Sequence, residues 1–168
     1  ISMPIYYELS TKNLMKVISN AHNNTSFKTP IIKFNDLIEL KDDIVIISGG
    51  KGSHIFEYLK RDNFKKADAI IEELRKNFND DFVLEAQRTN RIDEVDYFNK
   101  VIPISIEKGI PVIATNDVLF SNKDDFDIHE TKVCINTGKT LNDPNREKAF
   151  SEQQYFKSPE EMANLFHD

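Results

Sequence analysis

Three short apolar runs, separated by stretches with helical periodicity, decide which class of fold is open to this chain. The runs cover residues 44–47, 82–88 and 112–115. The first contains four consecutive β-branched residues and is followed by paired glycines, which is typical of a strand. The third has no polar alternation, so we expect it to be covered on both faces, as in parallel sheets. Together the runs predict an α/β fold in which parallel strands alternate with helices through right-handed crossovers.

Helical periodicity fills the stretches between the runs. The spacing of apolar residues predicts helices over residues 12–21, 35–40, 53–59, 64–78, 92–108 and 124–137. A last helix is expected to start after Ser158, which forms a capping box with Glu161 and is followed by proline at the first helical position.

Local signals refine the ends of these elements. Gly109 and Gly138 follow two predicted helices and are expected to cap them, while Pro103 inside one helix predicts a kink or break near Ile102. Residues 5–9 are β-prone, so we predict a further strand there, with Ser10 and Thr11 capping the helix that follows.

Size and composition predict a soluble, acidic protein. The 168 residues are enough for one domain or part of one, and the net charge of -6 argues against this chain gripping nucleic acid by itself. One cysteine, Cys134, favours a reducing compartment, and no membrane span or signal peptide is visible. We therefore expect a cytoplasmic location. The chain starts at Ile1 rather than at methionine, which we interpret as a fragment of a longer protein.

Polar residues follow each predicted strand. Ser48 and Gly49 come after the first, Thr89 after the second, and Asn116 and Asp117 after the third. In α/β proteins the carboxyl ends of parallel strands form the rim that holds ligands and metals. Asp117 is open to two interpretations, a ligand at this rim or an ordinary aspartate in a strand-end turn.

Other candidates for a site are better explained structurally. Asp127 and His129 could suggest a metal, but two residues apart on a helix their side chains point about 200° from each other. We assign Asp127 to the polar first turn and His129 to a structural hydrogen bond. The glycines around Gly50 match no nucleotide-binding spacing and favour a tight turn. No motif for an independent catalytic centre is present in the sequence.

Six sequence blocks, in order along the chain, carry a resemblance to a known family. They resemble the PHP domain of bacterial DNA polymerase III alpha subunits and read IISGG (46–50), LEAQRTNR (84–91), PVIATND (111–117), DFDIHE (125–130), GKTLNDPNR (138–146) and SEQQYFKSPEEM (151–162). The resemblance implies a distorted seven-stranded (β/α) barrel. Residues 1–168 would be an incomplete PHP domain that lacks the first strands and helices.

The resemblance also implies a metal site that has degenerated in this chain. The D-x-H element of active members falls on Asp117 and Leu119, and the histidine that follows the LE-x-Q motif falls on Thr89. Neither leucine nor threonine replaces imidazole as a ligand, and the opening H-x-H element would precede Ile1. The implied vestigial site, with Asp117 as the one candidate ligand, consists of Glu85, Gln87, Thr89, Asn116, Asp117 and Leu119. His129 matches a helical H-E element beside the site, which agrees with a structural role.

The function implied is that of a non-polymerising fragment of a replicative DNA-directed DNA polymerase. Polymerisation, with Mg²⁺, would take place elsewhere in the full chain, which would also contact DNA. This part would act as a scaffold, without a cofactor or a catalytic residue of its own, and dock the proofreading exonuclease subunit and other holoenzyme subunits, but no membrane. Whether the fragment is an enzyme stays open. The alternative is a metal-dependent phosphoesterase or 3′–5′ exonuclease that uses Glu85, Gln87 and Asp117.

Overall fold

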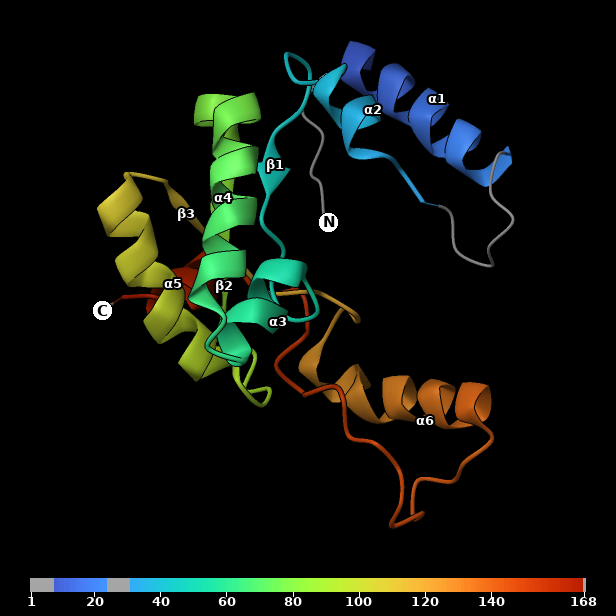
Figure 1. Cartoon of the computed structure of the whole chain (residues 1–168). Helices are drawn as coiled ribbons and strands as arrows, with labels where there is room; N and C mark the ends of the chain where they lie inside the picture. The colour runs from blue at the N-terminus through green and yellow to red at the C-terminus, as the bar shows by residue number, and fades with distance from the viewer. Residues whose placement is uncertain (1–7, 24–30, 168) are drawn as a thin grey trace.

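A small parallel sheet lies at the centre of the molecule. The computed structural model describes residues 8–23 and 31–167, and within these ranges three strands pair in the order β1 (Ile46–Ile47), β2 (Phe82–Gln87), β3 (Val112–Thr115) (Figure 1). All pairs are parallel, with Ile46 opposite Phe82 and Gln87 opposite Thr115. The carboxyl ends of the strands therefore meet at one edge of the sheet. This arrangement confirms the prediction of an α/β fold with parallel strands.

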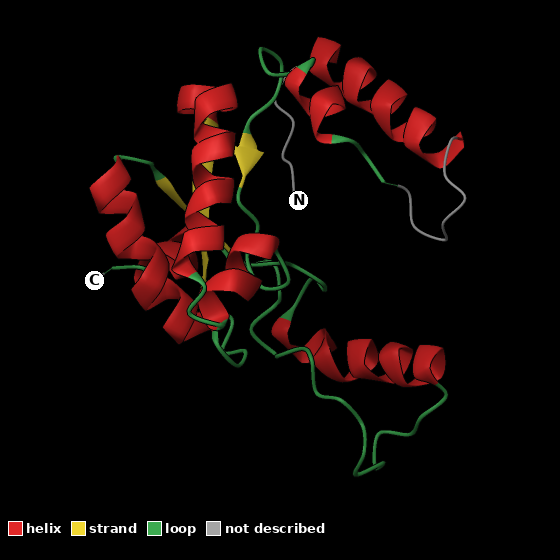
Figure 2. Ribbon diagram, in the orientation of Figure 1, coloured by secondary structure: helices red, strands yellow, loops and turns green. Residues whose placement is uncertain are grey.

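Helices occupy most of the remaining chain (Figure 2). They begin and end close to the predicted residues, and the last one carries the predicted capping box of Ser158 and Glu161. No helix in the described ranges is both long and apolar enough to cross a membrane. Their bounds are α1 (Glu8–Asn23), α2 (Phe34–Ile38), α3 (His54–Lys60), α4 (Phe64–Phe78), α5 (Glu94–Lys108), α6 (Phe126–Thr137) and α7 (Pro159–Leu165).

The core lies where α3, α4 and α5 pack on one another and on β2. α4 buries one stripe of apolar residues, spaced three or four positions apart as a helix requires: Ala67, Ile71, Leu74 and Phe78. Phe56 of α3 packs against Tyr97 of α5, with ring centroids 5.0 Å apart. Full burial of one such side chain contributes about 1.5–3 kcal/mol, so this face fixes α3, α4 and α5 against the sheet.

Helix α5 is continuous through its internal proline, so a break near Ile102 is wrong, while the alternative of a kink stays a prediction. Pro103 is exposed, and removes one backbone hydrogen bond without placing its ring in the core. Val101 on one side of it is fully buried, and Ile104 on the other packs against the core, so both halves of the helix are attached to the core. Gly109 ends the helix with φ 63°, a left-handed conformation that glycine adopts without strain.

Several element boundaries differ from the prediction: β1 begins at Ile46 rather than at residue 44, and α5 at Glu94 rather than at residue 92. The predicted strand at residues 5–9 is wrong for Glu8 and Leu9, which already belong to α1, while residues 5–7 lie outside the described part of the chain. Ser10 and Thr11 therefore lie inside that helix instead of capping it. The helix expected from residue 124 begins at Phe126, after a short 3₁₀ turn (Lys123–Asp125), and ends at Gly138 as predicted.

Strand β3 is more exposed than its sequence predicts. Ile113 is 38% exposed and Ala114 is also exposed, so the expectation of a strand covered on both faces is wrong. The reason is position, because β3 is the last strand of the sheet within the described residues and has a neighbouring strand on one side only. Three strands do not make a barrel, and the seven-stranded (β/α) barrel stays an expectation of the family.

Candidate functional site

The rim at the carboxyl ends of the strands contains a buried polar network. The Glu85 carboxylate accepts hydrogen bonds from the Gln87 amide, at 3.0 Å, and from the Thr115 hydroxyl. Glu85 and Gln87 lie two residues apart on β2 and therefore share one face of the sheet. The second carboxylate oxygen of Glu85 is buried without a hydrogen-bond partner among the described residues. The Ser48 hydroxyl accepts from the Glu85 backbone N–H at 2.9 Å, which ties the end of β1 to β2.

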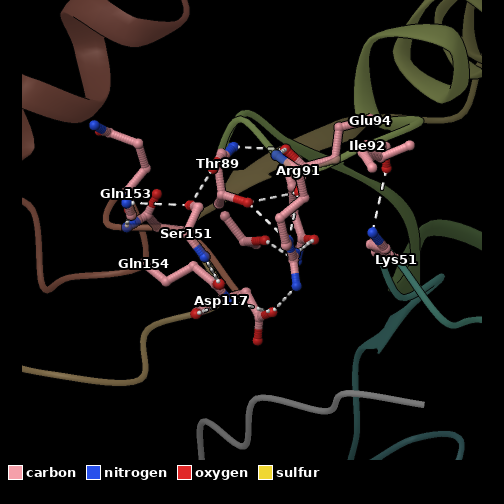
Figure 3. Close-up of polar contacts among 12 residues, drawn as sticks. Lys51, Thr89, Arg91, Ile92, Glu94, Asp117, Ser151, Gln153 and Gln154 are labelled. Atoms are coloured by element: carbon pink, nitrogen blue, oxygen red, sulfur yellow. Dashed lines mark hydrogen bonds and ion pairs between the residues drawn. The ribbon is translucent and has the colours of Figure 1, made fainter. Parts of the chain in front are cut away.

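Arg91 lies at the centre of this rim (Figure 3). Its side chain is only 8% exposed and comes from the loop between β2 and α5. The three guanidinium nitrogens donate to four oxygen atoms: Nε to Thr89 Oγ1 at 2.8 Å and Glu94 Oε1 at 2.9 Å, Nη1 to Asp117 Oδ2 at 2.7 Å, and Nη2 to Gln87 Oε1 at 2.8 Å. One side chain thus connects the end of β2, the first turn of α5 and the residues after β3.

Thr89 is completely buried, and both its backbone N–H and its hydroxyl bond to Glu94. Its backbone N–H donates to Glu94 Oε2 at 2.7 Å, and its hydroxyl donates to Glu94 Oε1 at 2.6 Å. Glu94 is the first residue of α5, where a negative charge interacts favourably with the helix dipole. A short side chain at this position is therefore bonded inside the protein.

Asp117 has a strained backbone and an exposed carboxylate. Its φ is 46°, a left-handed conformation that aspartate tolerates better than most residues. Its side chain is 41% exposed, and besides pairing with Arg91 it accepts from the Gln154 amide at 3.0 Å. Both features agree with a strand-end turn whose carboxylate is turned toward Arg91.

Asn116 and Leu119 anchor a distant segment rather than facing a ligand. The buried Asn116 amide donates to the carbonyl oxygens of Gln153, at 2.9 Å, and Tyr155, at 2.6 Å. The Leu119 backbone N–H donates to the Gln154 carbonyl at 2.8 Å, while its side chain is 40% exposed. These contacts attach residues 153–155 to the end of β3.

Asp127 and His129 lie outside this network, with no hydrogen bond or ion pair to it among the described residues. Asp127 is exposed in the first turn of α6, as predicted. The His129 ring packs against Phe120 and Phe150, with centroids 5.6 Å and 4.9 Å away. The expected hydrogen bond is not seen at Nε2, which is buried without a partner in the described part of the protein. His129 therefore contributes packing.

Tyr97 borders the network from α5 and stays protonated. Burial, opposed by the nearby Ser48 hydroxyl, raises the pKa of Tyr97 to about 12, and the charge of Glu85 acts in the same direction as burial. The phenol oxygen makes no well-formed hydrogen bond among the described residues. A buried carboxylate and a neutral phenol thus lie side by side beneath the rim.

Two residues of this rim lack the side chains that usually hold zinc or iron. Thr89 carries a hydroxyl and Leu119 an apolar side chain, whereas these metals are held mainly by histidine, cysteine and carboxylate side chains. The acceptors that remain at the surface of the network are already bonded to the guanidinium of Arg91. Within residues 8–23 and 31–167, no group of three or more histidine, cysteine, aspartate or glutamate side chains is placed to hold a metal ion.

Arg91 is the site residue that reasoning from the sequence missed. It lies in a loop without periodicity, and its partners are two to 26 positions away in the chain. The one signal available was a basic residue four positions after the end of a strand that is rich in acceptors. The structure places Glu85, Gln87, Thr89 and Asp117 in one hydrogen-bond network, together with Glu94, Ser151 and Gln154 (Figure 3).

Known proteins similar to this chain point to one family. A model of the PHP domain matches residues 6–89. The chain is also similar to proteins named DNA polymerase III subunit alpha: 39% identical over 158 residues in Escherichia coli, 36% over 158 in Pseudomonas aeruginosa and 35% over 157 in Haemophilus influenzae. These alignments cover 94% of this chain and 14% of each relative. The family model covers half of the chain, and the chain therefore belongs to the PHP domain family.

Proposed function

We propose that the chain is the PHP region of a replicative DNA polymerase and acts there as a structural scaffold with a degenerate metal site. The support is similarity along 94% of the chain to proteins named DNA polymerase III subunit alpha. Because the chain spans 14% of their length, polymerisation with Mg²⁺ and contact with DNA are assigned to other parts of the full-length protein. The whole protein would work in the cytoplasm.

The proposal that the metal site is degenerate rests mainly on the hydrogen bonds and burial of Thr89. Its hydroxyl donates to Glu94 at 2.6 Å and accepts from Arg91 Nε at 2.8 Å, and the residue is completely buried, so the hydroxyl is held inside the protein and does not reach solvent. Leu119, the other position at which active members carry a histidine, offers an apolar side chain. A rim that has lost two imidazoles and keeps its shape through internal hydrogen bonds is suited to support, not to hydrolysis.

A scaffold of this kind would dock the proofreading exonuclease subunit and other holoenzyme subunits. The support is a well-packed core beneath a rim whose side chains bond to one another. A polymerase that lacks proofreading in its own PHP region needs a separate exonuclease held nearby. Calorimetry should show that the full-length natural protein binds the exonuclease subunit of the same organism. Deletion of residues 1–168 should abolish or weaken this binding. Unchanged affinity after their deletion would contradict docking at this region.

One observation favours a second candidate, a metal-dependent phosphoesterase or 3′–5′ exonuclease. Glu85 is 4% exposed and keeps one carboxylate oxygen without a partner among the described residues, as a retained metal ligand would. Gln87 and Asp117 would complete the site.

Metal loading separates the two candidates. The full-length natural protein and its Asp117→Asn variant are stripped with a chelator, loaded with Mn²⁺ or Zn²⁺, and assayed for bound metal and for hydrolysis of a phosphodiester. For a scaffold we expect equal metal content and no hydrolysis in either protein. Metal and hydrolysis that both depend on Asp117 would establish the phosphoesterase instead. Primer extension by residues 1–168 alone would contradict the assignment of polymerisation to other domains.

A further inference from the structure

We infer that Arg91 is a built-in cation that takes over the task of a metal ion at this rim. Its guanidinium group would hold together, by charge and hydrogen bonds, the oxygen-bearing side chains that a bound ion would otherwise hold. The inference rests on the proposed function, because it concerns a rim that binds no metal. It concerns Arg91 itself, which no motif of the sequence singles out.

The first argument is the kind of atom that surrounds Arg91. All four partners of the guanidinium group are oxygen atoms, supplied by a carboxylate of α5, a carboxylate after β3, an amide and a hydroxyl (Figure 3). Oxygen atoms of this kind are the ligands that hard divalent cations such as Mg²⁺, Mn²⁺ and Ca²⁺ prefer. A set that suits a divalent ion is thus gathered around the charged end of one side chain.

The second argument is the balance of charge. Glu94 and Asp117 form ion pairs with Arg91 and with no other basic side chain in the described part of the chain. Glu85 joins the same network through the Gln87 amide, which bonds Glu85 on one side and Arg91 on the other. Removing the guanidinium would leave the carboxylates of Glu94 and Asp117 without their cation, the first buried and the second exposed. Uncompensated buried charge is strongly unfavourable unless a cation binds.

Glu85 and a cavity beside the network give further support. One oxygen of Glu85 is buried and has no partner among the described residues, which leaves a coordination position open inside the rim. A cavity of about 400 Å³ adjoins the network and is lined by Gln87, Arg91 and Glu94 together with residues of α5 and α7. The cavity gives an ion a route from solvent to the network once the arginine side chain is removed.

The test is whether a divalent ion replaces the missing arginine. In the full-length natural protein, Arg91→Ala is compared with the unchanged protein after chelation and dialysis against Mn²⁺, with bound Mn²⁺ measured by elemental analysis and by electron paramagnetic resonance. We expect Arg91→Ala to bind about one Mn²⁺ more per chain than the unchanged protein, with a higher melting temperature in Mn²⁺ than in chelator. Adding Asp117→Asn should abolish the extra ion.

The control is Arg61→Ala, which removes the same charge from an exposed pair with Glu57. It should bind no extra Mn²⁺. Folded Arg91→Ala without an extra ion overturns the inference and leaves the proposed function standing, whereas Mn²⁺ bound to the unchanged protein and lost in Asp117→Asn overturns the proposed function. If Arg91→Ala does not fold, Arg91→Gln, which keeps a hydrogen-bond donor, is measured in its place. Failure of both to fold even with Mn²⁺ also overturns the inference.

Discussion

The guanidinium of Arg91 donates to the carboxylate of Asp117 at 2.7 Å, across 26 positions of the chain. The arginine side chain is 8% exposed and the aspartate side chain 41%, so the pair lies at the boundary between the buried network and solvent. Through it, the loop after β2 is joined to the turn after β3. The contribution of the rim to stability can therefore be tested by changing one residue of this pair.

Neutralising Asp117 should destabilise the protein modestly. The change Asp117→Asn removes the charge that pairs with Arg91, while an asparagine still tolerates the backbone φ of 46°. Solvent screens the exposed carboxylate, so we expect this variant to lower the free energy of unfolding by about 1 kcal/mol in urea titrations. Glu57→Gln, at an exposed pair on α3, is the control and should cost less than about 0.5 kcal/mol. An equal loss of stability in both variants would mean that the Arg91–Asp117 pair stabilises the protein no more than an exposed surface pair does.

Gly50 should be required because of Gln87. A Cβ at position 50 would lie 2.3 Å from the side-chain carbonyl carbon and oxygen of Gln87, which would have to leave its bonds to Glu85 and Arg91. We expect Gly50→Ala to lower the free energy of unfolding by about 1–3 kcal/mol. In a Gln87→Ala background the same change should cost much less, because the clashing atoms are gone. Additive effects in this double-mutant cycle would show that Gly50 is needed for another reason.

Stability at alkaline pH should depend on Tyr97. Its pKa is raised from 10.0 to about 12 by burial, so between these values an unfolded chain loses the phenol proton while the folded protein keeps it. The unfolded state is thereby favoured, and the contribution of this group falls by at most about 1.4 kcal/mol per pH unit from pH 10 upward. Tyr97→Phe should remove that part of the slope in urea titrations from about pH 9 to 11.5. An unchanged slope would contradict burial as the cause.

The hydroxyl of Tyr155 should set the acidity of Glu161. The Tyr155 hydroxyl donates to Glu161 Oε1 at 2.5 Å and is the main reason why the pKa of Glu161 lies below its usual value. Since the folded pKa is depressed, the ionised form supports the start of α7 above the unfolded pKa, and this support is lost as pH falls through the folded pKa. Tyr155→Phe should raise the titration midpoint of Glu161 measured by NMR.

Glu160 is the internal control for this measurement. Its pKa is also lowered, by its own backbone N–H and the Ser158 hydroxyl, and Tyr155 takes no part. The midpoint of Glu160 should therefore stay unchanged in Tyr155→Phe. A parallel shift of both glutamates would indicate a general disturbance of α7.

The sequence predicted helices and strands well where the spacing of apolar residues follows one type of secondary structure without interruption. The 64–78 helix and the 112–115 strand have the predicted bounds, since their apolar spacing is uninterrupted. The predicted burial of β3 was wrong, because the exposure of a strand depends on the elements that lie beside it and not on its own sequence. Reasoning from the sequence also missed Arg91, because no local pattern shows that Gln87, Glu94 and Asp117 converge on one loop residue. Pairings of this kind are set by tertiary structure alone.

The attachment of residues 153–156 to the end of β3 has a consequence for how this region can change during evolution. Asn116 and Leu119 bond to residues 153–155, and Phe120 forms a parallel bridge with Tyr155. The two ends of the segment between them are therefore held together beside the end of β3. Everything between them, α6 and the long loop after it, extends outward as a closed excursion (Figure 1). Lengthening a loop whose ends are already fixed costs little free energy, only about 0.6 kcal/mol for each doubling. Related chains can therefore gain or lose residues between positions 121 and 150 while the sheet and its rim stay the same.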